Sequence, residues 1–246
     1  MKAIAIIPAR YASTRFPGKP LVMINGKPMI QLVYEQCRKA FECVVVATDD
    51  ERIAETVKAF GGEAIITSAQ HLSGTDRCAE AAQILSSKYD FDVVVNIQGD
   101  EPFIDPAQLE QITTCFANPD TEIATLITPI HSTEILIDPN KVKAVVSIRG
   151  DALYFSRQPI PYQRDIPEAE WLKNHTYYLH IGLYAYRKEV LTRITQLAPT
   201  QLEIAEKLEQ LRWLENGYRI STVITSHGNI GIDTPPDLEK VKDLLK

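Results

Sequence analysis

The chain has 246 residues, of which 45% are hydrophobic and 24% are charged, and this composition excludes collagen-like, coiled-coil and disordered chains. Its 26 Lys and Arg side chains against 32 Asp and Glu give a net charge of −6, which argues against a nucleic-acid binder. Its apolar runs are far shorter than the roughly 18 residues of a membrane helix. With no signal peptide after Met1, we expect a cytoplasmic protein without membrane insertion.

The first half of the sequence alternates short apolar runs with longer amphipathic segments. Buried strands are expected at residues 3–7, 43–48, 63–67 and 92–97. Helices are expected at residues 29–40, 51–60, 75–87 and 105–117. Because strands that alternate with helices of this length are joined by right-handed crossovers, the pattern predicts a Rossmann-like, mostly parallel sheet.

This alternation ends after Ile123. Residues 142–148 and 153–155 have the pattern of two strands around a turn, which makes them antiparallel. A proline-rich surface loop follows at residues 157–174, and a strand returns at residues 177–186. The fold class is therefore α/β with an antiparallel insertion.

The last third of the sequence predicts two helices. Residues 201–216 carry an apolar stripe at helical spacing, and Thr234 precedes two prolines that begin a terminal helix. The length of the chain is compatible with a single domain over residues 1–246.

The loop after the first strand contains three cations, Arg10, Arg15 and Lys19. In an open α/β sheet the ligand lies at the carboxyl ends of the strands, where these cations could surround a triphosphate and stabilise a pyrophosphate leaving group. Neither a GxGxxG fingerprint nor a P-loop is present, because Gly26-Lys27 is followed by Pro28. The alternative is a solvated basic loop.

Two aspartates end short apolar segments, Asp100 after the strand at 92–97 and Asp233 after Ile232. Mg²⁺ takes one or two protein carboxylates together with waters and phosphate oxygens, so both positions suit this ion. The alternative for each is a residue at the start of a helix. That alternative is weaker for Asp100, because Asp105 already caps the following helix.

Seven segments together resemble the 3-deoxy-manno-octulosonate cytidylyltransferases, also called CMP-Kdo synthetases. They are PARYASTRFPGKPL, SGTDR, NIQGDEPFI, ALYFSRQPIP, HIGLYAYR, LEQLRWLENG and GIDTPPDLEKV, and the resemblance extends from residue 4 to about residue 242. The resemblance implies a fold of the sugar nucleotidyltransferase type. It also implies that CTP and 3-deoxy-D-manno-octulosonate (Kdo) give CMP-Kdo and pyrophosphate with Mg²⁺ as cofactor, an activation step of lipopolysaccharide biosynthesis.

The resemblance also assigns roles to individual residues. The catalytic residues are Arg10, Lys19, Asp100 and Asp233, of which the two aspartates are the metal ligands. The nucleotide-binding residues are Ala9, Arg10, Arg15, Lys19, Ser73, Thr75, Arg77, Gln98 and Asp100. The sugar-binding residues are Arg157, His180, Tyr184, Glu203, Glu206 and Gln210.

The chemistry of the sugar-binding set is plausible in itself. Arg157 could pair with the carboxylate of a 2-keto-3-deoxy sugar acid. Glu203, Glu206 and Gln210 share one face of the expected helix and could bind hydroxyls, although such a row is usually just solvated. Finally, the insertion at about 130–180 resembles the family's dimerisation element, which implies a homodimer.

Two alternatives to this function stay open at the level of the sequence. The sugar could be 8-amino-Kdo or another 2-keto sugar acid, because the loop at residues 8–20 does not distinguish them. A catalytically silent nucleotide-binding regulatory protein belongs to a different class. The joint presence of Lys19, Asp100 and Asp233 disfavours it, because a silent protein has no chemical need for all three.

Overall fold

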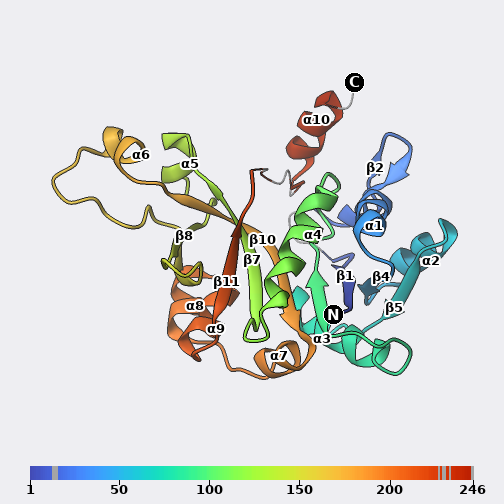
Figure 1. Ribbon diagram of the computed structural model, residues 1–246. Coiled ribbons are helices and arrows are strands. Elements are labelled where there is room, and N and C mark those ends of the chain that lie inside the picture. The colour runs from blue at the N-terminus through green and yellow to red at the C-terminus, as the bar shows by residue number, and fades with distance from the viewer. Residues whose placement is uncertain (13–15, 227, 229–230, 233, 245–246) are drawn as a thin grey trace.

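A nine-stranded sheet forms the centre of the molecule within the described residues (Figure 1). The structure is a computed structural model and describes residues 1–12, 16–226, 228, 231–232 and 234–244. The main path of the sheet runs through β11 (Ile220–Ile224), β7 (Ile123–Pro129), β10 (Tyr178–Arg187), β6 (Val93–Asn96), β1 (Ala3–Ala9), β4 (Val44–Thr48) and β5 (Glu63–Ile66). β8 (Lys143–Val146) and β9 (Ala152–Ser156) extend it beside β10, and β2 (Met23–Ile24) and β3 (Lys27–Pro28) form a separate hairpin.

Helices cover both faces of this sheet. One face is packed by α3 (Gly74–Leu85), α7 (Lys188–Ile194) and α9 (Glu209–Glu215). The other is packed by α1 (Met29–Ala40), α2 (Glu51–Ala59) and α4 (Pro106–Thr114). The remaining helices are η1 (Lys19–Leu21), η2 (Cys115–Ala117), α5 (Thr133–Ile137), η3 (Glu168–Glu170), α6 (Trp171–Asn174), α8 (Gln201–Glu206) and α10 (Pro235–Leu244). Across the described ranges, no helix is both long and apolar enough to cross a membrane.

The parallel part of the sheet is buried on both faces. β1 pairs in parallel with β4 and β6, and β4 pairs in parallel with β5. Ile4 and Ile6 of β1 pack toward α3, whereas Ala5 and Ile7 pack toward α1. Because successive side chains of a strand point to opposite faces, a sheet covered on both sides needs uninterrupted apolar strands. The expected Rossmann-like, mostly parallel sheet is confirmed.

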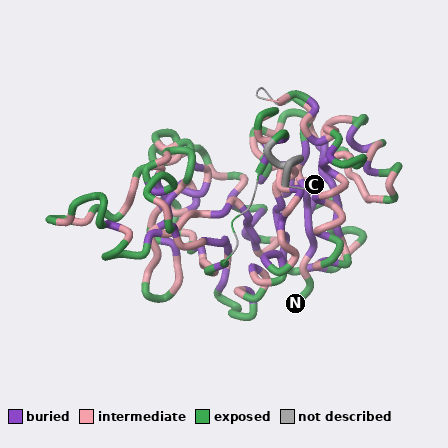
Figure 2. Tube along the Cα trace, turned by 90° about the horizontal axis from the view of Figure 1, so that it is seen from above, coloured by how far each residue is buried: buried purple, intermediate pink, exposed green. Residues whose placement is uncertain are grey.

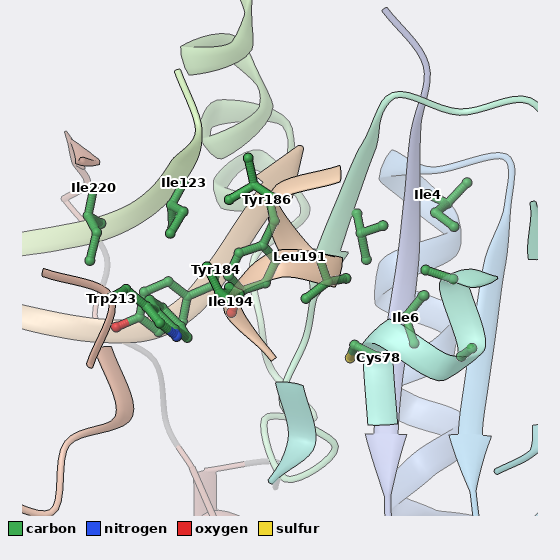
Figure 3. Close-up of a cluster of buried hydrophobic side chains, with 14 of the residues drawn as sticks. Ile4, Ile6, Cys78, Ile123, Tyr184, Tyr186, Leu191, Ile194, Trp213 and Ile220 are labelled. Atoms are coloured by element: carbon green, nitrogen blue, oxygen red, sulfur yellow. The ribbon is translucent and has the colours of Figure 1, made fainter. Parts of the chain in front are cut away.

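An aromatic cluster fixes α9 to one face of the sheet (Figure 3). The Trp213 ring of α9 lies edge-on to Tyr184 and Tyr186 of β10, with ring centroids 5.1 and 5.6 Å apart. Such pairs contribute about 0.5–1.5 kcal/mol each beyond the burial of their area. Figure 2 shows that buried residues follow the central strands while exposed residues gather in the outer loops.

The antiparallel part of the sheet begins at β10. This strand pairs antiparallel with β6 and β7, and its register against β7 shifts between Ile181 and Tyr184. β8 and β9 form the antiparallel hairpin that the sequence predicts. In Figure 1, α5, α6 and their loops project from the side of the molecule that lies away from β5. We call this projection, at about residues 130–180, the arm. The core of this arm is a separate cluster of Ile130, Leu136, Trp171 and Tyr177.

One predicted helix is wrong, because residues 201–216 form α8 and α9 instead of a single helix. Lys207 separates them with a φ of 53°, in the left-handed region that ends a helix. The Arg157 Nε donates to the carbonyl of Glu206 at 2.7 Å, so the end of α8 is held by a residue distant in sequence. The prediction failed because the apolar stripe continues across the break.

Several elements have no counterpart in the sequence prediction, among them β7, α5, α7 and β11. Two helices, η3 and α6, also form within residues 157–174, where the sequence predicts a surface loop, because Trp171 is buried in the core of this region. In addition, β1 continues through Pro8 to Ala9, two residues beyond the predicted end. This extension carries the chain into the region where the candidate site lies.

Candidate active site

A cavity of about 230 Å³ lies where β1 and β6 end. Its walls come from four segments, at residues 8–10, 19–20, 71–77 and 98–100. Seven of the nine predicted nucleotide-binding residues line it, namely Ala9, Arg10, Lys19, Ser73, Arg77, Gln98 and Asp100. The carboxyl ends of parallel strands therefore bring together the segments that the sequence singled out.

Two glycines allow these segments to approach one another closely. A Cβ at Gly99 would lie 3.1 Å from the carbonyl oxygen of Pro8, and a Cβ at Gly74 would lie 3.2 Å from the Pro8 Cγ. The contact at Gly99 is with backbone, which has little freedom to move. Glycine at these positions thus sets the width of the cavity.

Lys19 and Asp100 form an ion pair inside the cavity. The Lys19 Nζ lies 2.5 Å from the Asp100 Oδ2, and the two side chains are 13% and 27% exposed. Gly18, with a φ of 71°, turns the chain into the 3₁₀ helix η1 that begins at Lys19. One cation and one carboxylate are thereby fixed in the same cavity, next to Arg10.

Asp100 fits the requirements of a magnesium ligand. It is a partly exposed carboxylate in the turn that follows β6, and Arg10 and Lys19 of the basic loop line the same cavity. Mg²⁺ prefers such a carboxylate together with phosphate oxygens and water. The predicted second ligand, Asp233, and the predicted cation Arg15 lie outside the described residues. The amide of Ile232 donates to the carbonyl of Asp100 at 2.9 Å, so the chain next to Asp233 is attached to this strand end.

Hydrogen bonds and an ion pair to other residues of the protein hold the turn at residues 73–77. Ser73 caps α3 in a reciprocal capping box with Asp76. Arg77 is buried, donates to the Thr67 Oγ1 at 2.6 Å and lies 3.3 Å from Asp49. Its charge is therefore balanced by Asp49, while the residue still lines the cavity.

Thr75 lies behind the cavity and joins two distant helices. Its Oγ1 donates to the Glu209 Oε2 of α9 at 2.8 Å. Burial raises the pKa of the Glu209 carboxyl, as expected for an acid removed from water. Glu209 is not among the site residues predicted from the sequence. The only signal was its position within the LEQLRWLENG segment.

Two predicted sugar-binding residues, His180 and Tyr184, lie on β10. The His180 Nε2 is 3.0 Å from the Thr125 Oγ1, and burial lowers the pKa of His180 to about 3, which keeps the ring neutral. The hydroxyl of Tyr184 is buried and has no hydrogen-bond partner among the described residues. Gln98 connects this strand to the cavity, since its Nε2 donates to the carbonyl of Gly182 at 3.4 Å.

Arg157 and Glu206 are bound to each other and to the backbone. The carboxylate of Glu206 accepts from the Ser156 hydroxyl at 2.6 Å and from the Arg157 amide at 2.9 Å. The Arg157 guanidinium donates to the carbonyls of Glu206 and Pro139 at 2.7 and 3.0 Å. In this conformation both side chains stabilise the junction between β9 and α8.

The three predicted residues Glu203, Glu206 and Gln210 do not share one helix face, because α8 ends at Glu206 and Gln210 belongs to α9. Glu203 forms a two-pronged ion pair with Arg212 at 2.6 and 2.7 Å. Gln210 is buried, and its Nε2 has no hydrogen-bond partner among the described residues. The prediction that these three side chains form one row on a single helix is therefore wrong, because the helix breaks at Lys207.

Two further residues of the cavity, His71 and Leu72, received no role from the sequence analysis. Leu72 is 91% exposed at the cavity wall. His71 contacts Glu80 of α3. Neither position belongs to a periodic pattern, so no sequence signal marked them.

Comparison with known proteins places the chain in a family. A cytidylyltransferase family model matches residues 4–220. The 3-deoxy-manno-octulosonate cytidylyltransferase of Parabacteroides distasonis is 59% identical, and the alignment covers 100% of this chain and 98% of that protein. The enzyme of the same name from Bacteroides thetaiotaomicron is 57% identical, with coverage of 100% and 99%.

A solved structure agrees with these relatives. The structure of a CMP:2-keto-3-deoxy-manno-octonic acid synthetase in complex with CTP superposes with a TM-score of 0.89 at 44% sequence identity, and the match covers 100% of this chain and 98% of that chain. The family model, the full-length relatives and the solved structure all indicate a cytidylyltransferase, and the cavity lies at the strand ends where a ligand is expected in such a sheet. The chain belongs to the cytidylyltransferase family, among the 3-deoxy-manno-octulosonate cytidylyltransferases.

Proposed function

We propose that this protein transfers the cytidylyl group of CTP to 3-deoxy-manno-octulosonate and releases pyrophosphate. The observation that carries the proposal is the cavity at the ends of β1 and β6, which Arg10, Lys19 and Asp100 line and in which Lys19 and Asp100 form an ion pair. The relatives of 57–59% identity carry the name of this activity, and the solved structure at 44% identity holds CTP.

In the proposed reaction the anomeric hydroxyl oxygen of the sugar acid attacks the α-phosphorus of CTP. The bond between this phosphorus and the bridging oxygen of the leaving pyrophosphate breaks, and the hydroxyl proton passes to solvent. No covalent intermediate with the protein is needed. Lys19 and Arg10 compensate the negative charge that develops on the pyrophosphate, and the cavity walls hold the reacting groups in line.

We further propose that the reaction depends on Mg²⁺, held by Asp100 and Asp233. The fit of Asp100 to this ion and the attachment of Ile232 to its carbonyl support this assignment. When bound, Mg²⁺ supplies charge neutralisation on the phosphate oxygens and lowers the pKa of a coordinated hydroxyl. Lys19 must then exchange its bond to Asp100 for the triphosphate, which is feasible because both groups are partly exposed.

The wider biological setting is also proposed. We infer that the protein works in the cytoplasm for lipopolysaccharide biosynthesis, in line with the product that the relatives' name implies. We propose one domain over residues 1–246, with a homodimer formed by the arm at residues 130–180. Exposed apolar side chains of the arm, Ile137, Leu153 and Tyr162, support this interface.

The test of the proposed function is pyrophosphate release with CTP and Mg²⁺. The sugar is Kdo, 8-amino-Kdo or N-acetylneuraminate in parallel reactions, and UTP replaces CTP as the nucleotide control. Turnover with CTP and Kdo alone supports the proposal. Preference for another sugar keeps the chemistry and changes the substrate, whereas no release with any sugar contradicts an enzymatic role.

A further inference from the structure

One part of the cavity wall belongs to the segment at residues 67–73, which joins β5 to α3. His71, Leu72 and Ser73 of this segment line the cavity. The segment has no regular secondary structure of its own. Its conformation must therefore be fixed by bonds to neighbouring elements.

The two ends of this segment are held by the sheet and by α3. At one end, the Thr67 amide donates to the carbonyl of Thr48 at 2.8 Å, and the Thr67 hydroxyl accepts from Arg77. At the other end, Ser73 is fixed by its capping box with Asp76. The middle of the segment, residues 68–72, lies between these two anchors.

A single side chain from outside holds this middle part. The Glu80 Oε2 of α3 accepts from the Ser68 amide at 2.8 Å and also contacts the His71 Nε2. Within the described residues, no other group outside the segment forms a hydrogen bond with residues 68–72. The Ser68 amide and His71 hold the pKa of the Glu80 carboxyl below its usual value, so Glu80 is ionised at neutral pH.

We propose that Glu80, acting through His71, is a positioning residue that fixes the 67–73 segment in the shape that receives the nucleotide. Glu80 does not line the cavity, whereas His71 and its neighbours do. Loss of the Glu80 carboxylate frees residues 68–72 between two intact anchors, and ordering them again on binding costs conformational entropy. The effect is expected on CTP binding and not on the chemical step. This inference rests on the proposed function, because it assumes that the cavity binds CTP.

The test compares Glu80→Ala with Glu80→Gln and with Gln83→Ala. Gln83 is an exposed residue of the same helix and serves as the matched control. We expect Glu80→Ala to raise the Kd and KM for CTP about 10-fold, as for the loss of a charged hydrogen bond, with kcat and the KM for the sugar within about 2-fold. Glu80→Gln keeps an acceptor for the Ser68 amide and is expected to restore most of the affinity. Gln83→Ala is expected to behave as the wild type.

A double-mutant cycle with His71→Ala shows whether the two residues act as a unit. If Glu80 acts through His71, the double variant is expected to be no worse than Glu80→Ala alone. Hydrogen exchange of the 68–72 peptide is expected to accelerate in Glu80→Ala and not in Gln83→Ala.

Three results would overturn the inference. They are an unchanged Kd for CTP in Glu80→Ala, a fall in kcat without a change in CTP affinity, and additive effects of Glu80→Ala and His71→Ala. Failure of the proposed function would look different, since the wild type itself would then release no pyrophosphate with any sugar, whether or not it binds CTP in calorimetry. The two failures are therefore distinguishable.

Discussion

The parallel and the antiparallel parts of the sheet use their polar residues in different ways. At the ends of β1 and β6, Lys19 and Asp100 are partly exposed and face a cavity. Beyond β10, Arg157, Glu203 and Glu206 are engaged in bonds that hold α8 in place. Lys19 and Asp100 therefore lie where a ligand could reach them, whereas Arg157, Glu203 and Glu206 serve the fold in this conformation.

A sequence motif does not by itself reveal whether its side chains are free to bind a ligand. The guanidinium of Arg157 would bind a sugar carboxylate only by exchanging its bonds to the carbonyls of Glu206 and Pro139. Such an exchange costs part of the binding energy. Substitutions on the nucleotide side should therefore act mainly on catalysis, and those on the other side mainly on stability.

The largest effect is expected for Asp100→Asn. Loss of the carboxylate that we propose as a Mg²⁺ ligand should lower Mg²⁺-dependent kcat by at least about 1000-fold, because the phosphate charge would no longer be compensated in the transition state. The thermal midpoint should change little, since the side chain is partly exposed at a strand end. Pyrophosphate release is the measurement, with Asp90→Asn as control because Asp90 forms a surface pair with Lys2. Near-normal turnover in Asp100→Asn would remove Asp100 from the mechanism.

Lys19→Ala is expected to have the next largest effect. Removing this cation should lower kcat/KM for CTP about 100-fold, which corresponds to about 3 kcal/mol of transition-state stabilisation. Steady-state kinetics at saturating sugar measures it. Lys27→Ala is the control, because Lys27 pairs with Glu35 on the surface. Equal kcat/KM in the two variants would contradict the role of Lys19.

On the antiparallel side, Lys143→Met tests whether buried charge serves the fold. Lys143 is fully buried and its Nζ donates to the carbonyls of Asp138, Lys141 and Arg157. Leaving these acceptors without a donor should lower the free energy of unfolding by about 3 kcal/mol. Urea denaturation measures this loss, and Lys141→Met changes an exposed neighbour as the control. The same denaturation midpoint in both variants would show that the three hydrogen bonds from the Lys143 Nζ do not stabilise the fold.

The smallest effect is a pH dependence of stability from His180. Its pKa is about 3 in the folded protein, against 6.5 for the free side chain, so the unfolded chain binds the proton first. The stability that this group contributes is complete above pH 6.5 and is lost as the pH falls toward 3, at up to about 1.4 kcal/mol per pH unit.

Denaturation of the wild type and His180→Gln between pH 7 and 5 measures this slope. The variant is expected to lose less stability per pH unit than the wild type. His131→Gln, at an exposed histidine, should keep the wild-type slope. The same slope in all three proteins would show that His180 is protonated as readily in the folded state as in the unfolded chain.

The sequence alone determined the parallel part of the fold and the place of the nucleotide cavity. Uninterrupted apolar runs of a few residues require a sheet covered on both faces, and polar groups that follow such runs must gather at one edge of that sheet. Arg10, Lys19 and Asp100 were located in this way, whereas Gln98 came only from the resemblance to the family. The information is local, because each strand and its polar end are adjacent in the chain.

Only the tertiary structure decided how the other polar side chains are used. Thr75 and Glu209 are 134 positions apart, and Arg157 and Glu206 are 49 apart, so no periodicity could pair them. The break at Lys207 is likewise held from β9, through Arg157. A side chain's partners depend on which segments the fold brings together. The sequence pattern of one segment contains no information about which distant segments will contact it.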